Sequence, residues 1–228
     1  MSTFGEISEP SSRTAWEDWD DVLTSENAVD LHLEKDIEVP KQIDTFVIIE
    51  GRYLYDLIKS YHELELVNAS SDVNLRIYRT RNMNNYVCVI KDYDIVLSCE
   101  IVNLLVKYIN TSNNIISLLT KPLVEYQVSE RVSKDYVIRS LSSSKQSTTV
   151  LNISFPKLEQ PNIISGVSAG VHCWRDLSSK PFVAVVCFIG NPEEEQIPEL
   201  LDLLEKLKII PHVEKTHHST LLNSNLYI

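Results

Sequence analysis

Hydrophobic positions along the chain follow two spacings, one typical of strands and the other typical of helices. Short apolar runs rich in β-branched side chains indicate buried strands, and apolar residues that recur every third or fourth position indicate an amphipathic helix. The expected strands cover 45–50, 72–80, 85–90, 114–119, 135–141 and 181–190. The expected helices cover 52–66, 94–109, a stretch that opens at Pro161 and a stretch within 192–210.

The helix expected at Pro161 rests on its first residue and on the spacing that follows. Proline is favoured at the first helical position, because the N–H group that it lacks would have no partner there. The apolar residues that then recur at helical spacing are Ile164, Val167, Val171 and Trp174.

The order of these elements predicts the fold class and the domain organisation. Buried strands separated by helices indicate a layered α/β/α domain with a largely parallel or mixed sheet. We expect this domain to cover 41–211, between an acidic, largely disordered N-terminal arm at 1–40 and a flexible C-terminal tail at 212–228. No internal repeat is visible.

Charge is concentrated in the N-terminal arm. The formal net charge is -11, and residues 1–38 hold eleven Asp or Glu against two Lys or Arg. An acidic total argues against a nucleic-acid partner, which selects basic surfaces. The arm has the composition of a solvated, disordered segment. The alternative is an arm that meets a basic partner surface, with Trp16 and Trp19 on one face of a short helix as its docking element.

Composition also bears on the compartment. The chain has no apolar run long enough to span a bilayer, and its start, MSTFGEISEP, lacks the basic and apolar regions of a secretory signal. Its four cysteines form no CxxC pair and have no histidine at ligand spacing. We therefore expect reduced, mostly buried thiols in a cytosolic or nuclear protein, and no zinc site. These cysteines are Cys88, Cys99, Cys173 and Cys187.

One short motif raises the possibility of an enzyme. GVSAG, residues 166–170, fits the G-x-S-x-G nucleophile elbow, with Ser168 at its centre. An elbow requires a buried strand that runs directly into the serine, and the preceding LEQPNIISG has no strand pattern. Small residues at a close helix contact are therefore the favoured interpretation, and an α/β-type serine hydrolase using Ser168 is the alternative. Its acid and base candidates are Asp176 or Asp202, followed by His212, His217 or His218.

The sequence contains no pattern for a cofactor or a metal. The chain has five glycines and neither a GxGxxG nor a GxxxxGK[ST] motif. VIIEGRYLY is a strand–Gly–helix turn that could lie near an anion, although a lone glycine there more often reflects turn geometry alone. The three C-terminal histidines have no carboxylate or cysteine spaced to complete a metal site.

The chain printed here ends in NSNLYI, a polar run followed by Leu226, Tyr227 and Ile228. A terminal carboxylate is bound by a cationic or N–H-lined pocket, and a tyrosine adds contact area and one hydroxyl group at low entropic cost. The polar residues 223–225 would let such a tail reach another molecule. The alternative is a tail that folds back on its own domain.

Several stretches resemble the proteasome assembly chaperone 1 family. The similar segments are KLEQPNIISGV, the strand–Gly–helix stretch FVIIEGRYLYDLI, the opening TFGE with its acidic arm, and the end NSNLYI. The resemblance covers both ends and much of the second half, and it is thin across 60–150. The family's terminus is Ser-Asn-hydrophobic-Tyr-X, and this chain has Ile228 where threonine is familiar.

This resemblance implies a non-enzymatic chaperone without a cofactor. It implies a heterodimer with proteasome assembly chaperone 2 on the outer face of the α-subunit ring of the 20S proteasome. Leu226, Tyr227 and Ile228 would enter a pocket between neighbouring α subunits, where a lysine meets the carboxylate. The pair would promote α-ring formation, and it would block α-ring dimers and premature activator binding. The implied core is similar to the nucleoside-phosphorylase-like α/β fold, without its active site.

Overall fold

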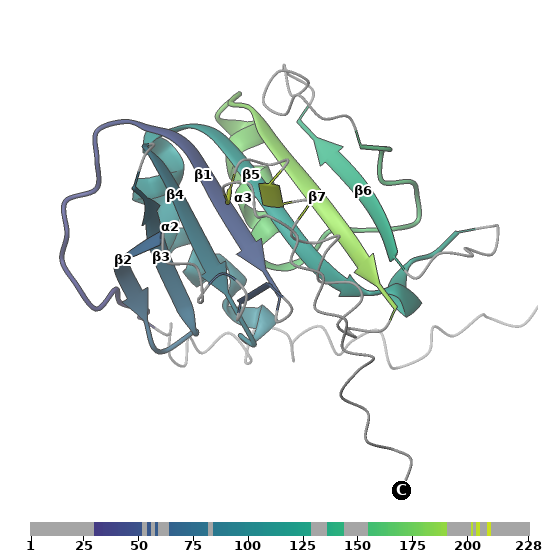
Figure 1. Cartoon of the computed structure of the whole chain (residues 1–228), viewed down its shortest axis with the longest axis horizontal. Helices are drawn as coiled ribbons and strands as arrows, with labels where there is room; N and C mark the ends of the chain where they lie inside the picture. Colours follow the sequence, from purple (N-terminus) through teal and green to yellow (C-terminus); the bar gives the residue numbers. More distant parts are fainter. Residues whose placement is uncertain are drawn as a thin grey trace, which may run out of the picture. The chain divides into compact units, whose positions relative to one another are not determined.

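The computed structural model describes residues 30–51, 54–55, 58, 64–81, 84–128, 136–143, 155–190, 202, 204–205 and 209–210. Apart from Asp30, these residues belong to one compact unit, Leu31–Ile228. The described residues build a seven-stranded sheet in the order β2-β3-β4-β1-β5-β7-β6 (Figure 1). The strands are β1 (Ile43–Glu50), β2 (Leu64–Ser70), β3 (Leu75–Thr80), β4 (Asn85–Ile90), β5 (Ser112–Pro122), β6 (Tyr136–Ser142) and β7 (Phe182–Ile189).

Parallel strands form the centre of the sheet. β1 pairs in parallel with β4 and β5, and β5 pairs in parallel with β7. Strands buried on both faces consist of continuous apolar runs, as β7 does, whose eight residues are all buried. The carboxyl ends of β4, β1, β5 and β7 therefore share one edge of the sheet, which we call the carboxyl edge.

Antiparallel strands flank this centre, and other segments cover both outer strands. β3 pairs with β2 and β4, and β6 pairs with β7. Backbone bonds join β2 to the segment before β1, with the Glu34 amide donating to the Ala69 carbonyl at 2.8 Å. β6 is bonded in the same way to Pro156 and Leu158. Covered edges leave fewer backbone groups free to pair with another chain.

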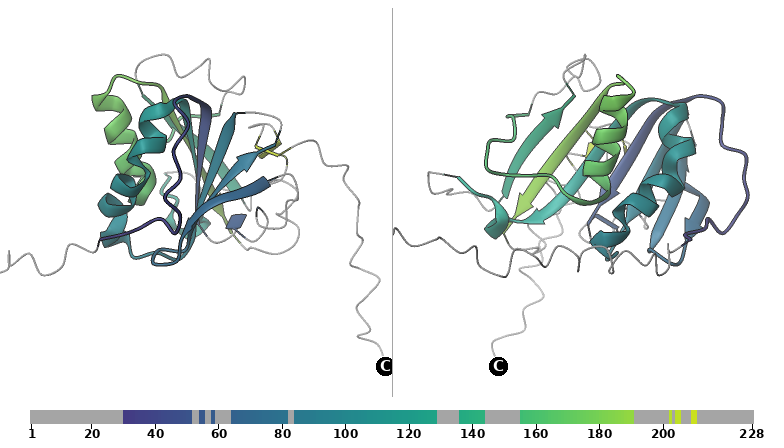
Figure 2. Two further views of the ribbon diagram at one scale, coloured as in Figure 1. Left: turned by 90° about the vertical axis from the view of Figure 1, so that its left-hand side faces the viewer. Right: turned by 180° about the vertical axis from the view of Figure 1, so that it is seen from behind.

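Two helices cover one face of the sheet, namely α2 (Ser98–Thr111) and α3 (Gly166–Leu177) (Figure 2). Alternate strand residues such as Phe46 and Ile48 face them, because successive side chains of a strand point to opposite faces. The Phe46 and Tyr108 rings stack with their centroids 5.6 Å apart. A fully buried side chain of this size stabilises the fold by roughly 1.5–3 kcal/mol.

The opposite face has its own apolar cluster. Val47 and Ile49 of β1 point into it, together with helical residues that lie far from them in the chain. These helical residues are Leu54, Ile58 and Leu204. The sheet therefore has an apolar layer on each face, which confirms the expected layered α/β class with a mixed sheet.

Most elements agree with the sequence pattern, but two helix expectations were wrong in part. Residues 64–66 belong to β2 rather than to a helix, because Leu64 and Leu66 follow the strand period and pair with β3. Pro161 lies in a turn, and α3 begins only at Gly166. The intervening segment is held outside the helix, because the Asn162 side chain bonds both the amide and the carbonyl of Gln127.

The cysteine expectation was also only half right. All four thiols are free, but Cys99 and Cys173 are exposed on the two helices, whereas Cys88 and Cys187 are buried in strands. Burial raises the pKa of Cys187 to about 12 and also raises that of Cys88, so both stay protonated at neutral pH. None of the helices in the described part of the chain combines the length and the apolar content of a membrane span.

Candidate functional site

Two sets of residues were expected to carry function, and the structure describes only part of one of them. Leu226, Tyr227 and Ile228 lie outside the described residues, as do His212, His217 and His218. The acidic arm and the segment 211–228 also lie outside them. Ser168, the candidate nucleophile, is described, and so are Asp176 and Asp202.

Ser168 lies in the first turn of α3 and is fully buried. Its hydroxyl donates to Glu50 Oε2 at 2.6 Å and accepts a hydrogen bond from the Ser117 hydroxyl. Its backbone amide donates to the same Glu50 oxygen at 3.0 Å. Both hydroxyl contacts are therefore internal to the fold, between α3, the end of β1 and the middle of β5.

This arrangement does not make a nucleophile elbow. Gly166 follows a segment without strand structure, whereas an elbow places its serine at a sharp turn directly after a strand. Asp176 lies in the last turn of α3, at the opposite end of the helix from Ser168. Among the described histidines, His172 packs edge-on against the Phe182 ring. A buried serine bonded to a carboxylate cannot reach a substrate carbonyl.

Glu50 is the centre of this network, although the sequence pattern did not single it out. It is the last residue of β1, and its carboxylate accepts hydrogen bonds from the Tyr93 hydroxyl and from both donors of Ser168. The Tyr93 oxygen in turn accepts from the Val167 amide at 3.0 Å. Two otherwise unpaired amides of the first turn of α3 therefore have partners, and a negative charge lies at the positive end of the helix dipole.

Glycine is required where this network meets the helix. Gly166 has φ +76°, and a Cβ atom there would overlap Glu50 Oε1 and the Tyr93 hydroxyl. Burial, followed by the Glu50 carboxylate, raises the pKa of Tyr93, so its hydroxyl stays protonated and donates. The anion considered for the helix after Gly51 is a different matter, because Glu50 caps the separate helix α3 and the start of the helix after Gly51 lies outside the described residues. The signal in the sequence was a charged residue ending an otherwise apolar strand.

A pocket of about 240 Å³ lies beside this network at the carboxyl edge. Its lining combines polar groups of Thr120 and Lys121 with the apolar side chain of Ile95. Lys121 is already engaged, with the Ile163 carbonyl at 3.4 Å and Glu125 at 3.7 Å. The described residues contain no group of three or more His, Cys, Asp or Glu side chains arranged to hold a metal. Glu50, Asp92, Tyr93 and Ser165 also line this pocket.

Comparison with known proteins gave a result by structure only. No protein-family model and no curated protein matches the chain. Among solved structures it is similar to Pyrococcus furiosus PbaA, described as an archaeal homolog of proteasome-assembly chaperone. That match has a TM-score of 0.58 at 14% identity and covers 81% of this chain and 88% of PbaA.

Two further solved structures have similar scores. Pyrococcus furiosus PbaB, described as an archaeal proteasome activator, has a TM-score of 0.55 at 9% identity, covering 81% of this chain and 91% of PbaB. A Thermoplasma acidophilum protein of unknown function has a TM-score of 0.56 at 13% identity, covering 75% of this chain and 80% of that protein. At such identities the likeness shows a shared fold. The chain thus has the α/β fold found in a homolog of proteasome-assembly chaperone.

Proposed function

We propose that the chain is a non-enzymatic chaperone of 20S proteasome assembly, acting in the cytosol or nucleus. It pairs with a related chain, proteasome assembly chaperone 2, and the pair binds the outer face of the α-subunit ring. There it promotes ring formation and blocks both ring dimers and early activator binding. Its C-terminal residues Leu226, Tyr227 and Ile228 enter a pocket between two α subunits.

The observation that carries this proposal is the likeness to PbaA, which covers 81% of this chain and 88% of PbaA. That likeness concerns the folded domain. The terminal hydrophobic–Tyr–X sequence supports the same function as a separate, sequence-based argument.

The described part of the chain also supports a chaperone over a hydrolase. Ser168 is fully buried and has both its donor and its acceptor capacity used within the fold. His172, the histidine of α3, packs against Phe182 and does not line the pocket beside Ser168, so it is not placed there as a general base. We therefore assign the Glu50–Ser168 network to the stability of α3.

The tail has the chemistry of a small binding hot spot. Tyr227 supplies a rigid aromatic anchor, Leu226 an apolar one, and the terminal carboxylate of Ile228 an anion for a lysine. Truncating a central aromatic anchor commonly costs about 2 kcal/mol or more, which is roughly 30-fold in affinity.

Deletion of residues 226–228 tests this function directly. Binding of the full chain and of the deletion variant to purified 20S particles is measured by biolayer interferometry, in the presence of the second chaperone. We expect at least a 30-fold loss of affinity, with an unchanged circular dichroism spectrum and melting temperature.

A matched control replaces residues 223–225 by Gly-Ser-Gly, which keeps the reach of the tail and its final three residues. This variant should bind as the unaltered chain does. Equal binding by the deletion variant would contradict the role of the tail. A fluorophosphonate probe that labels the chain but not a Ser168→Ala variant would favour the hydrolase instead.

A further inference from the structure

The outer face of the two helices has very little charge. α2 and α3 lie side by side on one face of the sheet, and both are described along their whole length (Figure 2). A helix surface exposed to water usually has charged residues along it. Here the exposed residues include two charged ones, Lys107 on α2 and Asp176 on α3. We call the uncharged surface between them the helix face, and its exposed residues are Cys99, Asn103, Asn110, Cys173 and Leu177.

Printed contacts between the helices make the helix face one continuous surface. The Trp174 indole N–H donates to the Asn110 side-chain oxygen at 2.9 Å. Gly170 packs so closely on Val102 that a Cβ atom there would lie 2.9 Å from Val102 Cγ2. Earlier residues of α3 thus meet earlier residues of α2, and later residues meet later ones. The two helices therefore run in the same direction in direct contact.

The residue types on the helix face are ones that proteins usually bury. Cysteine is among the residues most often found buried, yet Cys99 and Cys173 are both exposed here. Leu177 is 86% exposed, and the ring of Trp174 is half-buried beside it. Depletion of charge is typical of the centre of a protein–protein interface. The composition therefore indicates that another chain covers the helix face.

The remaining charged side chains of the helical layer point inward or are already bonded. Arg175 is fully buried and donates to backbone carbonyls. Glu100 is half-buried in the first turn of α2, and one of its carboxylate oxygens is enclosed. Lys180 follows α3 and donates to the Asn110 carbonyl at 2.8 Å, so the negative end of the α2 dipole offsets its charge. The helix face is therefore bordered by one exposed cation and one exposed anion.

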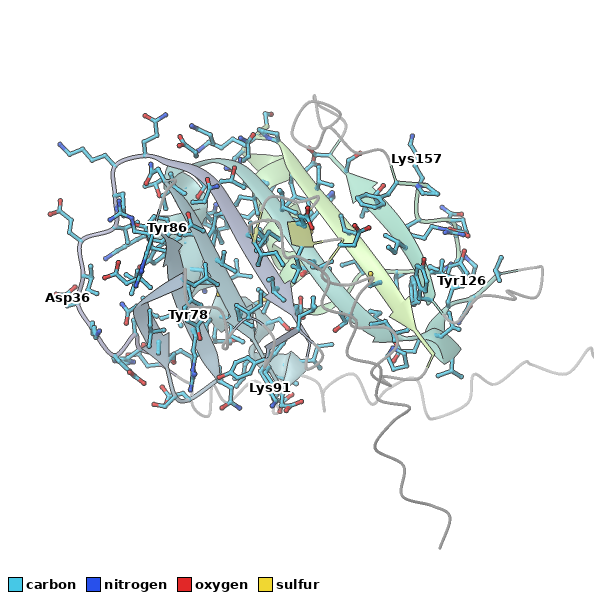
Figure 3. The ribbon with its side chains drawn as sticks, viewed as in Figure 1. Asp36, Tyr78, Tyr86, Lys91, Tyr126 and Lys157 are labelled. Carbon is cyan, nitrogen blue, oxygen red and sulfur yellow. The ribbon has the colours of Figure 1, made fainter. Side chains whose placement is uncertain are left out.

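Two carboxylates lie farther out, beyond Lys107. Asp36 and Glu38 line a groove of about 640 Å³ together with Lys107, and neither forms an ion pair with it in the described structure. Their segment is bonded to β2 and lies on the side of α2 away from α3 (Figure 2). Figure 3 labels Asp36 at this outer side of the molecule. Lys35 and Lys41 of the same segment offset part of the charge, so these carboxylates flank the helix face without lying on it.

The positions of Lys107 and Asp176 make the helix face complementary to itself. In a two-fold contact each copy offers the same surface. When α2 of one copy lies on α3 of the other, Lys107 approaches Asp176 of the second copy, and the same pair forms again on the opposite border. The centre has no charge to repel its own copy. Opposite charges facing each other across an interface favour association and fix its register.

We propose that the helix face is the contact surface for a second copy of this chain, in a two-fold dimer bordered by two Lys107–Asp176 pairs. Neither side chain has an ion-pair partner within the described part of its own chain, so both are available for this contact. The proposal does not depend on the proposed function, because it concerns the chain on its own.

Exchange of the two charges tests the pairing. Self-association of the full chain is measured by sedimentation equilibrium over a range of concentrations. Lys107→Glu and Asp176→Lys should each weaken it by about tenfold or more, because each places like charges opposite one another. The double variant restores opposite charges and should associate as the unaltered chain does. Asp36→Asn with Glu38→Gln is the control and should not weaken association, since it removes only the flanking carboxylates.

The thiols give a second measurement on the same face. Cys99 and Cys173 are exposed, whereas burial raises the pKa of Cys88 and Cys187 and keeps these thiols unreactive. Alkylation of Cys99 and Cys173 by iodoacetamide, followed by mass spectrometry, should slow as the chain concentration enters the range of the dimer. The Lys107→Glu variant should remain fast at the same concentrations, with an unchanged circular dichroism spectrum.

Three outcomes would overturn the proposal. The first is a chain that stays monomeric at every concentration. The second is a double variant that associates no better than the single variants, because then Lys107 and Asp176 do not face each other. The third is protection of the two thiols only when proteasome assembly chaperone 2 is added, which would assign the helix face to that chain instead. Binding to 20S particles tests the proposed function separately from all three.

Discussion

At the scale of single residues, Glu50 shows how one side chain joins three elements. It is the last residue of β1. Its carboxylate accepts a hydrogen bond from the hydroxyl of Tyr93, in the loop after β4, and caps the first turn of α3 through Ser168. A helix start that would otherwise attract a free anion is thus occupied by the protein's own carboxylate. The same contacts consume the hydroxyl of Ser168, the residue that a motif search identifies as a nucleophile.

Glu50→Gln should destabilise the domain by about 1.5–3 kcal/mol, because hydrogen bonds to a charged group are lost and an amide N–H₂ then faces donors. The free energy of unfolding from denaturant titration, monitored by fluorescence, measures this. Glu125→Gln is the control, because the Glu125 side chain is 52% exposed and lies 3.7 Å from Lys121 Nζ, so this change should alter stability by less than about 0.5 kcal/mol. Equal effects of the two substitutions would show that the network contributes nothing.

At the scale of elements, the sequence predicted the strands better than the helix boundaries. Buried strands in a sheet covered on both faces leave a continuous apolar run, so β1, β4, β5 and β7 could be predicted from such runs in the sequence. The start of α3 was not, because it depends on long-range bonds: Glu50 caps it from 118 residues away, and Gln127 holds the segment before it. A proline preference is local and cannot outweigh such contacts.

The Glu50 network was missed because its residues are far apart in the chain. Glu50, Tyr93 and Ser168 come from three separate segments, and only the folded structure brings them into hydrogen-bond contact. The spacing of apolar residues along the chain does not indicate these long-range contacts. The terminal residues Leu226, Tyr227 and Ile228 could be singled out from the sequence, because they are adjacent in the chain and their binding chemistry does not depend on the fold.

The segment that leads into α3 is joined to β6 by a cluster with a pH dependence. Glu159 accepts from Arg139 at 2.8 Å and from the hydroxyl of Tyr126, and the Arg139 guanidinium lies over the Tyr126 ring. Hydrogen bonding from Arg139, above all, lowers the pKa of Glu159 from about 4.5 to about 2. A lowered pKa in the folded state means that the carboxylate stabilises the fold above its unfolded pKa, and that this contribution is lost as the pH falls.

Glu159→Gln should therefore reduce stability at pH 6, and its difference from the unaltered chain should narrow as the pH falls from about 4.5 toward 2. Other carboxylates also titrate in this range, so the informative quantity is the difference between the two chains at each pH. Denaturant unfolding at pH 6, 4 and 3 supplies it. A difference that stays constant with pH would contradict the ion pair as its cause.

At the scale of the whole molecule, the proposed chaperone divides its binding among separate parts of the chain. In the proposed function the folded domain would pair with the second chaperone, while a short terminal sequence would recognise the ring. Linking two such contacts raises the effective concentration of each, so a weak tail contact still matters in the assembled pair. This division also means that the two contacts can be removed independently.

Addition of a single glycine after Ile228 separates the carboxylate from the side chains beside it. Leu226 and Tyr227 remain, the fold is untouched, and only the position of the terminal charge moves outward. A hydrogen bond to a charged group contributes about 1.5–3 kcal/mol, so affinity for 20S particles should fall roughly 10- to 100-fold. The same glycine inserted between Asn223 and Ser224 lengthens the tail equally and should leave affinity nearly unchanged. If both insertions weaken binding alike, tail length rather than the free carboxylate governs recognition, and the pocket need not contain a lysine.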